Sequence, residues 1–78
     1  MLEVKQAVAR AFQYAKELLS DQQPTNLQLE EVEYSNDDKW RITLGFDRLG
    51  AMSVRPERVF KKFTINADTG NLESMKMP

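Results

Sequence analysis

The sequence FKKFTINADTGNLESMKMP, which occupies residues 60–78, predicts a β-hairpin. Its first part alternates apolar and polar side chains, and the residues NADTGN at 66–71 follow as a turn. Within the turn, residues 68–70 supply a side-chain acceptor and a glycine that tolerates positive φ. We therefore expect one strand over 58–66 and another over 72–77. Because the chain opens with a helical pattern and closes with this hairpin, it combines a helix with antiparallel strands.

Residues 3–20 predict a helix that is apolar on one side. Apolar side chains recur there at spacings of three and four, at Val4, Ala7, Val8, Ala11, Phe12, Ala15, Leu18 and Leu19. This spacing is typical of an amphipathic helix, and its alanines allow close approach to a sheet. We expect the helix to end near Ser20 or Asp21, because Pro24 disfavours helical geometry at the residue before it. Tyr14 lies off the stripe and is expected to be a surface aromatic.

Residues 27–34 and 39–46 predict two strands joined by a short loop. The second strand alternates regularly, with Trp40, Ile42, Leu44 and Phe46 on one side. The first strand changes parity between Leu29 and Val32, which requires one extra residue. We therefore expect a β-bulge near Glu30-Glu31. The resulting pairs are Tyr34 with Trp40, Val32 with Ile42, Glu33 with Arg41, Leu29 with Leu44 and Leu27 with Phe46.

The segment 47–57 predicts a long connection, because Gly50 and Pro56 interrupt regular structure. Together the elements predict an α+β fold in a single domain, residues 1–78. One N-terminal helix packs on a four-stranded antiparallel meander sheet, in the order α-β-β-β-β. Leu72 and Met75 differ in parity, and we expect a twist near the turn to bring both to the core. Polar side chains cover the sheet face opposite the helix, namely Glu31, Glu33, Arg41, Thr43, Lys62 and Thr64.

The composition excludes several kinds of chemistry. The chain has no cysteine and no histidine. It therefore has no disulfide, thiolate zinc site or thiol nucleophile, and it lacks the commonest general base and metal ligand. The acidic residues within 30–38 are interpreted as a solvated strand face and a polar turn, not as catalytic carboxylates or a Ca²⁺ loop. We expect no enzymatic activity, no metal and no cofactor.

Charge and hydropathy set expectations for partners and location. Eleven basic and twelve acidic residues give a net charge of -1, which argues against a dedicated polyanion binder. No apolar run approaches the roughly 20 residues needed to cross a bilayer. Residues 1–5, MLEVK, lack a basic region followed by an apolar stretch, so we expect no signal peptide. We expect a cytoplasmic location, and a mature secreted domain stays open as an alternative.

The C-terminal hairpin resembles that of the PepSY-like group of small α+β domains, which share a cystatin-like layout. The resemblance is carried by Phe63-Thr64-Ile65-Asn66-Ala67-Asp68-Thr69-Gly70-Asn71-Leu72, with Asn66 where the group usually has aspartate. It covers about a fifth of the chain closely and the rest in element order. The resemblance implies binding or inhibition of other proteins, often peptidases and often outside the cytoplasm. The expected absence of a signal peptide departs from that pattern.

Two binding surfaces are predicted for the 47–57 connection and the strand after it. In the first, Leu49, Met52, Val54 and Phe60 form an apolar patch for another protein or a second copy, with Arg55 and Arg58 steering acidic partners. In the alternative, Arg58, Phe60, Lys61 and Lys62 bind nucleic acid through a base stacked beside basic side chains. The patch could also close over the core, and the basic residues could be a solvated face. We expect a small non-catalytic binding module of otherwise unknown function.

Overall fold

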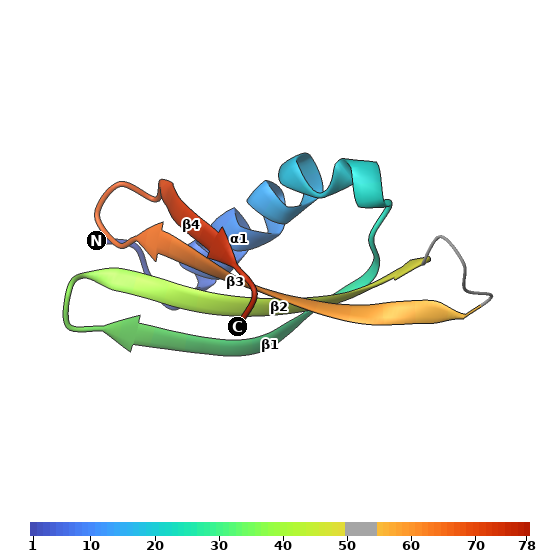
Figure 1. Cartoon of the computed structure of the whole chain (residues 1–78). Helices are drawn as coiled ribbons and strands as arrows, with labels where there is room; N and C mark the ends of the chain where they lie inside the picture. The colour runs from blue at the N-terminus through green and yellow to red at the C-terminus, as the bar shows by residue number, and fades with distance from the viewer. Residues whose placement is uncertain (50–54) are drawn as a thin grey trace.

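The computed structural model describes residues 1–49 and 55–78. This part of the chain comprises α1 (Val4–Leu18), the 3₁₀ helix η1 (Ser20–Gln22), β1 (Thr25–Ser35), β2 (Lys39–Leu49), β3 (Pro56–Asn66) and β4 (Leu72–Lys76). The strands form one antiparallel sheet in the order β1-β2-β3-β4, and α1 lies across one face of it (Figure 1). The predicted α+β layout, a helix followed by a four-stranded meander, is confirmed.

The core lies between α1 and the covered face of the sheet. The helix contributes Ala7, Ala11 and Ala15, all fully buried. The sheet and its connections contribute Leu19, Ile42, Leu44, Phe46, Val59, Phe63, Ile65 and Ala67. Because the buried helix residues are small, the larger aliphatic and aromatic side chains of β2 and β3 fill the space beneath the helix.

Two residues of the predicted helical stripe, Val4 and Leu18, do not reach this core. Val4 and Leu18 are 41% and 49% exposed, whereas Tyr14, expected on the surface, packs against the core. The stripe is therefore narrower than predicted and centred on the alanines. The helix ends at Leu18, and the backbone then turns through η1 to Gln23, whose φ is 49°, immediately before Pro24. The predicted stop before the proline is confirmed.

The bulge predicted in β1 is present. Leu29 pairs with Leu44 and Glu31 pairs with Thr43, so Glu30 is the extra residue. The predicted pairs of Tyr34 with Trp40, Val32 with Ile42 and Glu33 with Arg41 are also confirmed. A second irregularity, between Thr25 and Gln28, was not predicted. Asn26 lies within it and has a φ of 53°, in the left-handed region that asparagine tolerates.

The predicted 47–57 connection is too long. β2 continues to Leu49 and β3 begins at Pro56, and the two strands stay in continuous register up to that pair. Two ion pairs between directly opposite residues support this pairing: Arg48 Nε lies 3.5 Å from Glu57 Oε2, and Arg58 Nη1 lies 3.2 Å from Asp47 Oδ1. Opposite charges across two strands stabilise pairing, although each residue alone is typical of a loop. The hairpin arm formed by β2 and β3 extends past the helix (Figure 1).

The C-terminal hairpin contains a bulge as well. Ile65 pairs with Leu72 and Thr64 with Ser74, so Glu73 is the extra residue. This bulge, not a twist alone, brings both Leu72 and Met75 against the core.

The turn before β4 is held by Asn66. Its Oδ1 accepts hydrogen bonds from the backbone N–H groups of Asp68 and Thr69, at 2.8 and 3.0 Å. Its Nδ2 donates to Glu73 Oε2 at 2.8 Å. An aspartate here could make the first two bonds but would repel Glu73. Gly70 has a φ of 78°, as the turn prediction required.

Substitution of Ala11 tests the close packing of helix and sheet. Ala11→Leu adds volume where the side chain is fully buried. We expect a loss of about 1–3 kcal/mol in the free energy of unfolding, the usual effect of overpacking. Ala9→Leu on the exposed side of the same helix is the matched control and should change stability by less than about 0.5 kcal/mol. Urea unfolding followed by Trp40 fluorescence measures both. Equal effects would show that the helix does not approach the sheet through its alanines.

Candidate functional site

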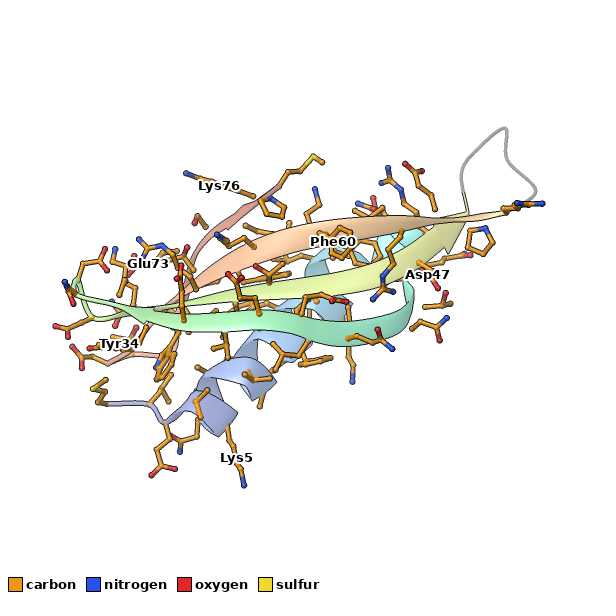
Figure 2. The ribbon with its side chains drawn as sticks, turned by 90° about the horizontal axis from the view of Figure 1, so that it is seen from below. Lys5, Tyr34, Asp47, Phe60, Glu73 and Lys76 are labelled. Atoms are coloured by element: carbon orange, nitrogen blue, oxygen red, sulfur yellow. The ribbon has the colours of Figure 1, made fainter. Side chains whose placement is uncertain are left out.

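The sheet face opposite the helix, here called the outer face, carries three of the predicted site residues, Arg58, Phe60 and Lys62. Figure 2 labels Phe60 on this face. The strand register arranges it in rows. One row runs Glu33, Arg41, Thr64, Ser74, the next runs Glu31, Thr43, Lys62, Lys76, and a third runs Gln28, Gly45, Phe60. Carboxylates therefore lie mainly on β1 and ammonium groups on β3 and β4. Figure 2 places Phe60 midway along β3 and Asp47 toward the hairpin arm.

Among the described residues, Arg58 makes four side-chain hydrogen bonds on this face. Its guanidinium crosses from β3 over β2 and reaches β1, donating to Glu30 Oε1 at 2.8 Å and Gln28 Oε1 at 3.0 Å. It also donates to Asp47 Oδ1 at 3.2 Å and to the carbonyl oxygen of Asn26 at 3.1 Å. These contacts join three strands through one side chain. We call Arg58 with Asn26, Gln28, Glu30 and Asp47 the Arg58 cluster.

The Arg58 cluster shifts the pKa of two of its groups. The hydrogen bond from Arg58 to Glu30, followed by that to Asp47, raises the pKa of the guanidinium. The pKa of Asp47 lies below its ordinary value, first because Asn26 Nδ2 donates to it at 2.8 Å and then because of Arg58. A depressed carboxyl pKa means that Asp47 favours folding when ionised. This contribution is complete above the ordinary pKa and is lost as the pH falls through the folded-state value.

Gly45 makes room for this crossing. A Cβ at this position would lie 2.7 Å from Nη2 of Arg58 and 2.8 Å from Oε1 of Glu30. Gly45 sits on β2 directly between Gln28 and Phe60, in the path of the guanidinium. A glycine in the middle of a central strand is otherwise unfavourable. A glycine is required at position 45 because the Arg58 side chain passes directly over it.

The predicted apolar patch is described only in part. Met52 and Val54 lie outside the described residues, and for Leu49 only the backbone is described, at the end of β2. Phe60 is on the outer face as predicted and is 39% exposed. The guanidinium carbon of Arg58 lies 5.8 Å from the centre of its ring, so part of the ring is covered by a cation–π contact.

The residues of the nucleic-acid alternative are not brought together on one surface. Arg58 is engaged by carboxylates of the same chain. Lys61 pairs with the buried Leu44 and therefore belongs to the helix-facing parity of β3, whereas Phe60 and Lys62 belong to the outer face. Of the four predicted residues, Phe60 and Lys62 share the outer face and make no hydrogen bond within the Arg58 cluster. Arg55, predicted to steer acidic partners, is exposed.

The two edges of the sheet differ. β1 is an edge along its whole length, and it is interrupted by two irregularities and carries Glu30, Glu31 and Glu33. On the other side, β4 pairs with β3 only from Lys62 to Ile65. The preceding residues of β3, 56–61, pair regularly with β2 and have no strand on the opposite side in the part of the chain that the structure describes (Figure 1). We call 56–61 the open half of β3.

A second feature of the outer face is a shallow hollow of about 320 Å³ that sequence reasoning missed. Its lining comes from β2, β3 and β4: Lys39, Arg41, Lys62, Thr64, Glu73, Ser74 and Lys76. The hydrogen bond from Lys39 to Glu73 raises the pKa of the lysine and lowers that of the glutamate. The parity change between Leu72 and Met75 could have predicted this hollow. It requires a bulge, and that bulge places Lys76 opposite Lys62.

Comparisons of the chain with protein-family models, curated proteins and solved structures gave no match. Among the described residues, no helix combines the length and apolar character needed to cross a membrane. Within 1–49 and 55–78, no group of three or more His, Cys, Asp or Glu side chains is placed to hold a metal ion.

The Gly45→Ala substitution tests the crossing of Arg58. Alanine in a strand interior is normally more stable than glycine by roughly 0.5–1 kcal/mol. Here we expect the opposite, a lower free energy of unfolding, because the added Cβ displaces the guanidinium from Glu30. In an Arg58→Gln background the same substitution should stabilise the chain. Urea unfolding of the four proteins measures both effects, and a stabilising Gly45→Ala in the parent would contradict the crossing.

Proposed function

We propose that this chain is a small non-catalytic binding module that takes up an extended segment of another protein as an added strand along the open half of β3. The observation that carries the proposal is the unpaired edge at 56–61, beside a strand that is regular on its other side. In an antiparallel sheet each residue directs its backbone N–H and C=O groups to one neighbour, alternately. Every second residue of the open half therefore offers both groups to an incoming strand.

The open half of β3 suits strand addition better than β1 does. Bulges and charged side chains are the usual means of blocking an edge strand. Both edges carry charges, Glu30, Glu31 and Glu33 on β1 and Glu57, Arg58 and Lys61 on the open half, but only β1 is also bulged. The β2–β3 register is continuous from Lys39–Asn66 to Leu49–Pro56, so the open half is an unbroken template. Pro56 removes one donor at its start only. Backbone hydrogen bonds would supply affinity, and alternate side chains would supply specificity.

Phe60 is the side chain that supports specificity. It lies near the C-terminal end of the open half, on the outer face, and 39% of it is exposed. An apolar side chain on the added strand would pack beside its ring and complete the burial that Arg58 begins. The PepSY-like resemblance of the C-terminal hairpin supports the same class of function, because that group is associated with binding other proteins. Arg58 has a structural part in this proposal and does not steer partners.

Selection of displayed random peptides tests the proposed strand addition. We expect enriched peptides that bind the parent chain, and we expect Phe60→Ser to weaken that binding by about tenfold, the effect of losing roughly 1.4 kcal/mol of contact. Leu29→Ser is the matched control, since Leu29 is similarly exposed but lies on β1. N-methylation of single peptide amides should abolish binding at every second position, because a bound strand directs alternate amides toward its neighbour.

Three outcomes would overturn the proposal. One is peptide binding that tolerates N-methylation throughout, since a strand cannot lose its ladder donors without effect. Another is equal loss in Phe60→Ser and Leu29→Ser. The third is failure of selection with a monomer–dimer equilibrium in sedimentation, which would show that the edge pairs with a second copy instead.

A further inference from the structure

Lys62 and Lys76 face each other across β3 and β4. They are directly paired in the strand register, and in the described ranges neither makes a hydrogen bond or an ion pair. Like charges placed directly opposite across strands destabilise pairing. A lysine on an edge strand, such as Lys76 on β4, can prevent pairing with other molecules. Lys62 has no such role, because it lies between Thr43 of β2 and Lys76 of β4.

The surrounding carboxylates do not relieve this pair. Glu73 lines the same hollow, but it accepts hydrogen bonds from Lys39 Nζ and Asn66 Nδ2. Asp37 is 3.4 Å from Arg41. Glu31 lies in the row of Lys62 but two strands away, roughly 10 Å at the usual strand spacing. The hollow therefore holds two uncompensated positive charges in a chain whose net charge is -1.

The floor of the hollow adds neutral donors. Thr64 and Ser74 are paired across the same two strands, one row along from the lysines. Neither hydroxyl has a hydrogen-bond partner in the described part of the chain, and both residues are partly buried. Lys62, Lys76, Thr64 and Ser74 thus all line an open space of about 320 Å³. That volume accommodates one tetrahedral oxyanion with its water.

We propose that this hollow binds a phosphate dianion, either inorganic phosphate or the terminal group of a phosphate monoester. A dianion neutralises both lysines, whereas a carboxylate or a phosphodiester carries one charge and leaves one lysine uncompensated. Its oxygens accept from Thr64 and Ser74 as well as from the ammonium groups. The site lies on β3 and β4 beyond the open half of β3, and it does not depend on strand addition.

The test is an NMR titration of the ¹⁵N-labelled chain at constant ionic strength, with chloride as the balancing anion. Inorganic phosphate and phenyl phosphate at pH 7.5 should each give saturable shifts confined to the residues that line the hollow. Tighter binding of phenyl phosphate identifies a monoester ligand, and equal binding identifies free phosphate. When the pH is lowered below the second pKa of phenyl phosphate, about 6, its affinity should decrease because the dianion is then lost.

Variants and a diester separate this site from general salt effects. The double variant Lys62→Gln, Lys76→Gln should lose about tenfold in affinity, the size expected when two exposed ion pairs are removed. The control Lys5→Gln, Lys16→Gln removes two exposed lysines from α1 and should bind as the parent does. Shifts spread over the surface, equal affinity in both double variants, or tighter binding of dimethyl phosphate or a DNA oligonucleotide than of phenyl phosphate would overturn the proposal.

Discussion

The outer face of this sheet depends on one long side chain that crosses it. Arg58 starts on β3, passes over Gly45 of β2 and ends at Glu30 of β1. The Glu30 bulge places a carboxylate where the guanidinium ends, and the irregularity around Asn26 directs a carbonyl oxygen to the same group. The bulged edge strand is thereby joined to the centre of the sheet on the face that the helix does not cover.

This crossing divides the outer face into two parts. Around Arg58 the charges are paired within the chain, and the edge beside them is blunted by bulges and glutamates. Toward β4 the positive charges of Lys62 and Lys76 are not paired within the described residues, and β3 has an unpaired edge before Lys62. Neutralised charge favours stability, whereas uncompensated charge and unpaired backbone groups are available for binding. The phosphate proposal is located on the second part, whereas the proposed strand addition uses the edge of β3 that runs from Arg58 up to that part.

The sequence predicted the fold because its apolar parity is informative wherever one face of a strand is buried. Parity predicted a bulge near Glu30-Glu31, which the structure places at Glu30, and parity together with the short loop predicted the pairing of Tyr34 with Trp40. It could not predict the Arg58 cluster, whose members lie up to 32 positions apart and meet only because Gly45 has no side chain. It also missed the hollow. Without the Glu73 bulge, regular pairing from Ile65–Leu72 would set Met75, not Lys76, opposite Lys62.

The central claim is that 56–61 forms an open edge in the free chain, and amide hydrogen exchange tests it most directly. The account predicts alternation along the open half of β3, with slow exchange at residues directed to β2 and fast exchange at those between them. From Lys62 to Ile65, where β4 is paired, exchange should be slow throughout. Uniformly slow exchange over 57–61 in dilute solution would show that the edge is already covered, and it would contradict the account.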